Sequence, residues 1–289
     1  MTATASPPAA TGLDPQRIER LRDSAYRIRR HALDMGEVQG QGYIGQALGV
    51  ADVLAVLFGD VLNLRPTDPE WPERDRFLLS IGHYAIAAYA AFAEAGILPV
   101  EELETYGSDE SRLPMSAMAS YTPGMEISGG SLGHGLGIAT GMALGLRHQG
   151  RPARVVNLLS DGELNEGATW EAAMSCAHHG LSNVLAVVDV NALQADGPTA
   201  GVLRVDHLTD KWTAFGWNAR RVDGNDVAAL LTALDELRDA PDRPSVLLCD
   251  TRPGHGVPML ETREKAHFLR VEAHEWQIAR DQLTEGHQR

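Results

Sequence analysis

Two short apolar runs that each end in a polar side chain constrain the fold more than any other feature of the chain. Residues 155–159 run into Asp161, and residues 184–190 run into Asn191. The segment between them is long enough for one crossover helix, so the pattern predicts two parallel strands of one sheet. Both polar side chains would then lie at the carboxyl edge of the sheet, where open α/β sheets bind their ligands.

These two side chains are of the kind that bind a hard cation. A carboxylate oxygen of Asp161, the amide oxygen of Asn191 and a nearby backbone carbonyl suit Mg²⁺ or Ca²⁺, which can also keep phosphate oxygens of a ligand. Asp-Gly alone is most often only a turn, so the prediction depends on the residues around it. The sequence therefore predicts a site for a metal ion together with a diphosphate.

The segment from Ser160 to Gly197 resembles the thiamine diphosphate motif of the transketolase family. That motif is Gly-Asp-Gly followed about thirty residues later by Asn. Its transketolase form continues E-L-x-E-G-x-x-W-E-A and ends D-x-N-x-x-Q-x-x-G. Here Ser160 stands in place of the first glycine, a small residue that a tight turn at a strand end can hold. The matching positions are Asp161, Glu166, Trp170, Glu171, Asn183, Asp189, Asn191, Gln194 and Gly197.

This resemblance implies that the cofactors are thiamine diphosphate and Mg²⁺, with Ca²⁺ or Mn²⁺ as alternatives to Mg²⁺. It places Asp161, the side chain of Asn191 and the backbone carbonyl of Leu193 on the metal. Glu166 would belong to a carboxylate network at a subunit interface. The alternative for Glu166 is a solvated acid at the start of a helix, near the positive end of the helix dipole.

A glycine-rich segment carries a second resemblance. Residues 123–135, P-G-M-E-I-S-G-G-S-L-G-H-G, are similar to the transketolase segment P-G-x-E-x-S-T-G-S-L-G-Q-G, which lies against the cofactor. A glycine loop that opens a helix can aim N–H groups at an anion. Gly130 and Leu132 are therefore candidate contacts, and His134 stands where the family has glutamine.

Two histidines follow from further matches. Residues 79–83, L-S-I-G-H, are similar to L-S-x-G-H, in which the histidine reaches the diphosphate. The alternative for His83 is a helix cap or a packed core histidine. Residues 251–257, T-R-P-G-H-G-V, resemble T-x-K-G-x-G-V, and His267 follows at the position of W-H-G with different neighbours. The catalytic candidates are His83, Glu166 and His267, and the cofactor contacts are His83, Gly130, Leu132, Asp161, Gly162, Glu163, Asn191 and His267.

Two departures from the family concern the substrate. Tyr43 replaces a histidine that handles the sugar, and Ser116 replaces the histidine that meets the C1 hydroxyl of the donor. The loss of two imidazoles removes hydrogen-bond donors and proton carriers. Two explanations stay open: drift that Tyr43 and Ser116 partly offset, or a donor or acceptor unlike the common pentose phosphates. Tyr43, Ser116 and His134 are the substrate candidates.

The resemblance covers about residues 20 to 275, which correspond to the first third to half of a full-length transketolase. Thiamine diphosphate acts through a ylid, and the carboxylate that helps to form it comes from a separate pyrimidine-binding domain, which we do not find before residue 289. We therefore expect the N-terminal subunit of a split transketolase. It would be active only with a C-terminal pyrimidine-binding subunit, in a two-plus-two heterotetramer.

The expected reaction is transfer of a two-carbon ketol unit from a ketose or ketose phosphate donor to an aldose or other aldehyde acceptor. One alternative is a subunit of a 2-oxo acid decarboxylase or acyl-transferring enzyme with the same cofactor. The other is a non-catalytic subunit that only binds the cofactor or a partner. The lost histidines favour this last alternative, whereas Asp161, Asn191, His83 and Glu166 count against it.

Helical and extended patterns alternate along the chain, which predicts an α/β fold: an open, mostly parallel sheet with helices on both faces. We expect a disordered tail at residues 1–12 and a single thiamine diphosphate-binding domain over residues 13–289. The predicted strands are 76–80, 155–159, 184–190, 217–222 and 245–251. The predicted helices are 14–35, 46–62, 83–95, 99–106, 133–146, 168–180, 207–215, 225–239 and 263–284.

Composition excludes some partners. The net charge is −14 and no basic block is present, so a nucleic acid is not expected as a partner. No apolar run resembles a membrane span and residues 1–12 do not resemble a signal peptide. The two cysteines, Cys176 and Cys249, lie in apolar segments, as expected for buried thiols in a reducing compartment. We therefore expect a cytoplasmic protein.

Overall fold

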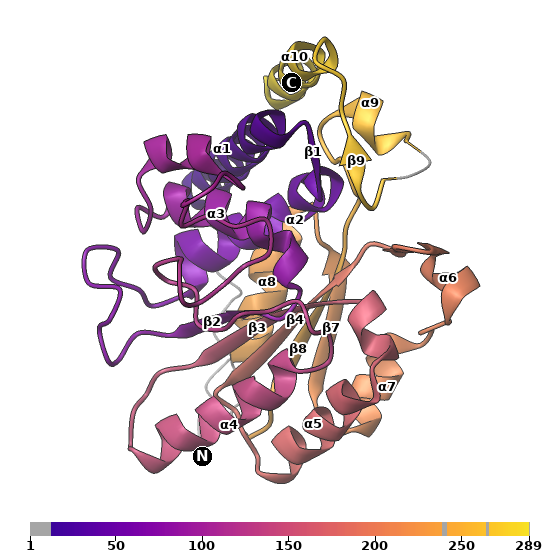
Figure 1. The fold of residues 1–289 in the computed structure, drawn as a ribbon. Coiled ribbons are helices and arrows are strands. Elements are labelled where there is room, and N and C mark those ends of the chain that lie inside the picture. The colour runs from indigo at the N-terminus through magenta and orange to yellow at the C-terminus, as the bar shows by residue number, and fades with distance from the viewer. Residues whose placement is uncertain (1–12, 239–241, 264–265, 289) are drawn as a thin grey trace, which may run out of the picture.

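The computed structural model describes residues 13–238, 242–263 and 266–288, so the tail predicted for residues 1–12 lies outside the described residues. Its centre is a five-stranded parallel sheet with the strand order β2-β3-β4-β8-β7 (Figure 1). The five strands are β2 (Arg76–Leu79), β3 (Val155–Ser160), β4 (Val184–Val190), β7 (Asn218–Asp223) and β8 (Ser245–Asp250). The predicted parallel sheet is thus confirmed.

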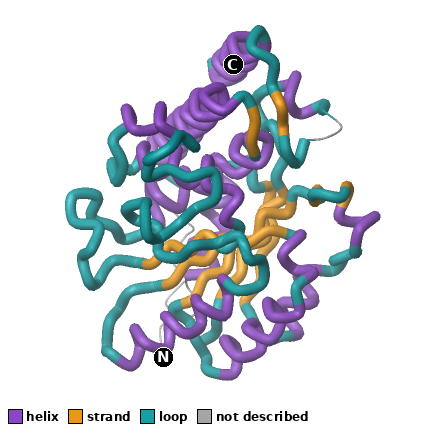
Figure 2. The backbone as a smooth tube through the Cα atoms, viewed as in Figure 1, coloured by secondary structure: helices purple, strands orange, loops and turns teal. Residues whose placement is uncertain are grey.

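Helices cover both faces of this sheet (Figures 1 and 2). One face carries α1 (Pro15–Gln39), α2 (Ile44–Val56), α3 (Ala85–Glu94) and α8 (Val227–Arg238). The other carries α4 (Gly135–His148), α5 (Gly167–His178) and α7 (Leu208–Ala214). Two short helices are α6 (Thr199–Val202) and α9 (Pro258–Glu261), and the longer α10 (Glu275–His287) packs on α1.

The two hydrophobic cores follow from the alternation of side chains along each strand. In β3, Val156 and Leu158 join the core beneath α1, α2, α3 and α8. Their neighbours Val155 and Leu159 join the core beneath α4, α5 and α7. The inner strands β3, β4 and β8 therefore form nearly continuous apolar runs in the sequence, because both of their faces are buried. The edge strand β7 is polar and partly exposed.

Short elements bring distant segments to the carboxyl edge of the sheet. β1 (Gln41–Gly42) pairs with β9 (Leu269–Arg270) in antiparallel fashion, although more than two hundred residues separate them. β5 (Leu193–Gln194) and β6 (Gly197–Pro198) form a small hairpin just after β4. Further short helical segments are a π-helix at Leu57–Val61 and 3₁₀ helices at Gly82–Tyr84, Val100–Thr105 and Gly162–Asn165.

One predicted helix is wrong in its first half. Residues 263–284 were expected to be continuously helical, but the helix begins only at Glu275. Before it, Leu269 and Val271 are buried, and β9 pairs with β1. A tertiary strand pairing therefore overrides the helical pattern of the sequence in this segment.

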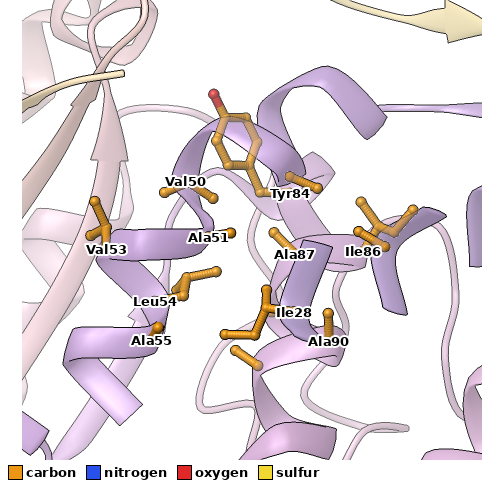
Figure 3. Packing of buried hydrophobic residues seen from close by; sticks show 14 of the residues in the cluster. Ile28, Val50, Ala51, Val53, Leu54, Ala55, Tyr84, Ile86, Ala87 and Ala90 are labelled. Atoms are coloured by element: carbon orange, nitrogen blue, oxygen red, sulfur yellow. The ribbon is translucent and has the colours of Figure 1, made fainter. Parts of the chain in front are cut away.

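Helix α2 with its π-helical extension also differs from expectation. By length and composition the segment Ile44–Val61 could cross a membrane. We had expected no such segment from the sequence. Every residue of α2 itself is buried within the fold, where the helix packs against α1, α3 and α8. Figure 3 shows this packing, with Val50, Ala51 and Leu54 of α2 facing Ile28 and Ala87.

Candidate active site

The polar residues that follow β3 and β4 lie side by side. Ser160 at the end of β3 is the register partner of Asp189 in β4, and the amide of Asp161 donates to the carbonyl of Asp189 (2.9 Å). This pairing places Asp161 and Asn191 at neighbouring strand ends. The structure therefore brings together the two side chains that the sequence assigned to the metal.

Asp161 is buried and its carboxylate is held on both oxygens. Oδ1 accepts from the Gly162 amide (2.9 Å), and Oδ2 accepts from the Ala192 amide (3.0 Å) and the Thr199 hydroxyl (2.9 Å). Burial, followed by the nearby charge of Asp189, raises the pKa of Asp161 to about 6. Ala192 has a left-handed backbone (φ 59°), a strained conformation of the kind that gathers at functional sites.

Asn191 is fixed by the residues around it. Its Nδ2 donates to Asp189 Oδ2 (2.8 Å) and to the Tyr84 hydroxyl (2.7 Å). Its Oδ1 accepts from the amide of Leu193 (2.9 Å), whose own carbonyl is the third predicted metal ligand. Asp189 also accepts hydrogen bonds from the hydroxyls of Tyr84 (2.6 Å) and Thr251.

The oxygen atoms of these residues are suitable ligands for a hard cation. One carboxylate, one amide oxygen and one backbone carbonyl are the ligand types of Mg²⁺ and Ca²⁺. Among the described residues, no cluster of three or more His, Cys, Asp or Glu side chains is placed to hold a metal. A cation held by Asp161, Asn191 and Leu193 would therefore need further oxygens from a ligand, as a Mg²⁺-diphosphate does.

The glycine loop lies directly against the end of β2. The Gly130 amide donates to the carbonyl of Ser80 (2.9 Å), and Gly130 has a left-handed φ of 117°. A Cβ on Gly129 would overlap the carbonyl oxygen of Leu79, and a Cβ on Gly82 would overlap the backbone of Gly129. Only glycine allows this approach, which leaves a bare backbone beside the strand ends.

A second buried acid, Glu163, lies behind this loop. Its Oε1 accepts from the Ser80 hydroxyl and from the Gly133 amide (2.8 Å). In the described part of the chain, its Oε2 and both polar atoms of the Asn157 side chain are buried without a hydrogen-bond partner. Glu163 therefore contributes to the interior beneath the loop, whereas its predicted direct contact with the cofactor stays a prediction.

A cavity of about 500 Å³ opens beside the loop. Its wall is aromatic on one side: the Tyr43 ring lies 4.7 Å from His83, 5.4 Å from His267 and 5.1 Å from Phe268 between centroids. The pairing of β1 with β9 places Tyr43 beside His267 and Phe268. The lining residues are Tyr43, His83, Met115, Ser116, Gly130, Leu132, His267 and Phe268.

Both histidines of the cavity favour the neutral form. Burial, together with the neighbouring His267, lowers the pKa of His83 to about 4. Burial also lowers the pKa of His267. Gln46 of α2 fixes His267 by contacting its Nδ1 (3.0 Å) and its carbonyl oxygen (2.7 Å). At neutral pH both rings can therefore accept as well as donate a hydrogen bond.

Two other predicted residues lie outside the cavity wall formed by the described residues. His134 is at the surface before α4, where its ring donates to the carbonyl oxygens of Ser131 (3.0 Å) and Leu132 (3.2 Å). Glu166 is exposed at the start of α5. The structure thus separates both of them from Tyr43 and His83.

Sequence reasoning gave no role to four residues of the site. Gln46 and Tyr84 position other side chains, and Met115 and Phe268 line the cavity. A glutamine in the first turn of a largely apolar helix was a usable signal. For Phe268 the signal was its departure from the family pattern beside His267.

A second cavity, of about 460 Å³, lies at the opposite edge of the sheet. Its lining includes Val184 and Ser245, the first residues of β4 and β8. The guanidiniums there are paired, for example Arg17 with Asp60. Open α/β sheets bind their ligands at the carboxyl ends of the strands, so we assign the chemistry to the cavity beside Tyr43.

Comparison with known proteins agrees with this geometry. Residues 21–288 match the family described as "Transketolase, thiamine diphosphate binding domain". A transketolase family protein of Sinorhizobium fredii is 62% identical, covering 89% of this chain and 92% of the relative. The 6-deoxy-6-sulfo-D-fructose transketolase subunit of a Clostridium species is 35% identical, covering 90% and 94%.

Solved structures show the same similarity. A transketolase variant from Pichia stipitis superimposes with a TM-score of 0.85 at 27% identity, covering 92% of this chain and 40% of the other. The transketolase from Campylobacter jejuni superimposes with a TM-score of 0.85 at 25% identity, covering 94% and 43%. This chain therefore spans less than half of these longer structures.

Proposed function

Because this chain belongs to the transketolase family, as an N-terminal subunit with the thiamine diphosphate-binding domain, we propose that it is half of a Mg²⁺-dependent ketol transferase. It would move a two-carbon unit from a ketose or ketose phosphate to an aldehyde. The juxtaposition of Asp161 and Asn191 at adjacent strand ends, with a bare glycine loop packed on the end of the neighbouring strand β2, is the observation that carries the proposal.

The residues of the chain divide the work as follows. Asp161, Asn191 and the Leu193 carbonyl would hold the cation, and the backbone at Gly130 would lie against the diphosphate. Thiamine diphosphate, when bound, supplies an electron sink for the cleaved carbon–carbon bond. His83, half-buried and with a pKa lowered to about 4, is neutral and can donate or accept one hydrogen bond at its ring nitrogens. Tyr43 and its aromatic neighbours would exclude water from the cavity.

A separate subunit would complete the enzyme. The Clostridium relative and an apulose-4-phosphate transketolase of Actinobacillus succinogenes are both named as subunits, and the chain covers 94% and 87% of their lengths. We propose that the partner is a C-terminal pyrimidine-binding subunit, which would bring the carboxylate that activates the cofactor.

We place the contact between two copies of this chain on α4 and α5. The side of α4 that faces solvent carries Gly137, Gly141 and Gly145, where an added Cβ would meet nothing within 4 Å. Ile138 of α4 and Met174 of α5 are 42% and 51% exposed. A bare glycine stripe lets a second backbone approach closely, which supports a two-plus-two assembly with Glu166 near its interface.

The substrate would differ from the common pentose phosphates. Tyr43 and Ser116 line the cavity where the family has histidines, and Phe268, 39% exposed, adds a second aromatic ring to its wall. An aromatic wall accommodates a less polar substrate than two imidazoles do. Comparison of pyruvate with a ketose phosphate as donor in the assembled enzyme separates ketol transfer from 2-oxo acid chemistry.

Substitution Asp161→Ala in the assembled enzyme tests the proposal. It should abolish Mg²⁺-dependent binding of thiamine diphosphate in isothermal titration calorimetry, because the cation loses its only carboxylate. Asp196→Ala removes an exposed carboxylate from the same loop region and should leave the affinity unchanged. Unchanged affinity in Asp161→Ala would refute the metal assignment, and an assembled wild-type enzyme that binds no cofactor would refute the proposed function.

A further inference from the structure

The side-chain amide of Asn191 has one orientation that satisfies its surroundings. Its nitrogen faces two acceptors, Asp189 Oδ2 (2.8 Å) and Tyr84 Oη (2.7 Å). Its oxygen faces a donor, the Leu193 amide (2.9 Å). Turning the amide by half a rotation would set its oxygen against a carboxylate and its NH₂ group against an N–H. The hydrogen-bond pattern therefore selects the orientation.

Tyr84 can act only as an acceptor toward Asn191. The single hydroxyl hydrogen of Tyr84 is used in the bond to Asp189 Oδ2 (2.6 Å), so its lone pairs remain for the Asn191 NH₂ group. The ring is 1% exposed. Figure 3 shows it above Ala51 and Ala87, with the hydroxyl directed away from that apolar cluster. The core therefore anchors the ring and aims its oxygen.

Asp189 is fixed in the same way. It is 1% exposed, and three donors hold it: Tyr84 and Asn191 on Oδ2, and the hydroxyl of Thr251 on Oδ1. Asp189 lies in β4, and Thr251 directly follows the adjacent strand β8. These strands are paired in the middle of the central sheet, so the sheet itself holds the acceptor that Asn191 meets.

We propose that Tyr84 and Asp189 are positioning residues for the cation site, which present the oxygen of Asn191, and not its nitrogen, as a ligand. An amide nitrogen does not bind Mg²⁺, so a freely turning amide would have to be ordered each time a cation binds. Partners of this kind behind a ligand typically change metal affinity by about 10–100-fold when they are mutated. This inference rests on the cation site of the proposed function.

Substitution Tyr84→Phe removes one acceptor while it keeps the ring. The assembled two-subunit enzyme, stripped of metal, is titrated with Mn²⁺ in the presence of thiamine diphosphate, and free Mn²⁺ is measured by electron paramagnetic resonance. We expect Mn²⁺ binding to weaken by about 10–100-fold. The matched control is Tyr89→Phe, which removes another buried hydroxyl, one that donates to the carbonyl of Pro114 (3.0 Å). It should stay within about twofold of wild type, because that site is separate from Asn191.

A double-mutant cycle shows whether Tyr84 acts through Asn191. If it does, Asn191→Ala combined with Tyr84→Phe binds Mn²⁺ no more weakly than Asn191→Ala alone. Asp189→Asn keeps an acceptor oxygen for the Asn191 amide, so it should retain most of the affinity. This variant also provides the test if Tyr84→Phe does not assemble.

Four results would overturn the inference: wild-type affinity in Tyr84→Phe, an equal loss in Tyr89→Phe, additive losses in the cycle, or a loss in Asp189→Asn as large as in Asn191→Ala. Each of these leaves Mn²⁺ binding by the wild-type enzyme intact and so leaves the proposed function standing. Failure of the wild-type enzyme itself to bind Mn²⁺ would overturn the cation site and the inference together.

Discussion

The buried carboxyl of Glu163 should make the stability of the chain depend on pH in a predictable way. Glu163 is fully buried, and burial raises its pKa from 4.5 to about 7, although hydrogen bonds from Ser80 and Gly133 oppose the rise. At a pH between these two values, the folded chain keeps a proton on Glu163 that the unfolded chain has lost. The charge of this acid therefore destabilises the fold.

The sign and size of the effect follow from proton linkage. The folded state binds more protons than the unfolded state. The contribution of Glu163 to the free energy of unfolding therefore falls as the pH rises above 4.5, and it levels off above about 7. The rise in pKa corresponds to about 3 kcal/mol in total. Between about pH 5 and about pH 8 the loss should be about 2.5 kcal/mol.

Substitution Glu163→Gln removes the ionisation and keeps the acceptor oxygen that Ser80 and Gly133 use. Urea denaturation of the purified chain at both pH values gives the free energies of unfolding. We expect the variant to gain about 2.5 kcal/mol on wild type between about pH 5 and about pH 8. Glu171→Gln, at an exposed position of α5, should show no such gain. An equal gap between Glu163→Gln and wild type at the two pH values would refute the reasoning.

Two further predictions concern the α4 interface and a buried ion pair. Gly137→Ala with Gly141→Ala on the open side of α4 should stabilise the isolated chain by about 1–2 kcal/mol through helix propensity yet weaken association of two copies in analytical ultracentrifugation; undiminished association would refute the α4 interface. Arg29→Met leaves buried Asp52 without its ion pair and should cost about 3–5 kcal/mol in urea denaturation. The exposed Arg27→Met in the same helix should cost under about 1 kcal/mol, and an equal cost in both would contradict the argument.

The proposed cation site at the carboxyl edge of the sheet could be predicted from the sequence because local patterns determine it. Each apolar run ends in a polar residue, and parallel pairing of β3 with β4 brings Asp161 and Asn191 together without any other information. The family resemblance supplied the cofactor. The predicted strands agree with the observed ones to within about two residues. The inner strands β3, β4 and β8 were predictable because they are buried along almost their whole length.

The aromatic wall could not be derived in this way. Tyr43 meets His267 and Phe268 only because β1 pairs with β9, and a two-residue strand has no periodicity that a sequence pattern could show. The same pairing made the prediction of a continuous helix over 263–284 wrong. Long-range pairings between very short segments are set by the finished fold rather than by local propensity.

The acids Asp161, Glu163 and Glu166 belong to one motif, but they have different surroundings that the sequence did not predict. In the run S-D-G-E-L-N-E-G the residues Glu163 and Glu166 look equivalent, yet the 3₁₀ turn at Gly162–Asn165 directs the first into the interior and leaves the second exposed. Asp161 and Glu163 both have raised pKa values, mainly because they are buried. A cation beside Asp161 would offset the cost of its charge, and its binding would release a proton when the pH lies near 6. Glu163 lies behind the loop, so the same cation would offset the cost of its buried charge to a smaller degree. Under the proposed function Asp161 would bind the cation, while Glu163 stays a proton-binding group of the interior.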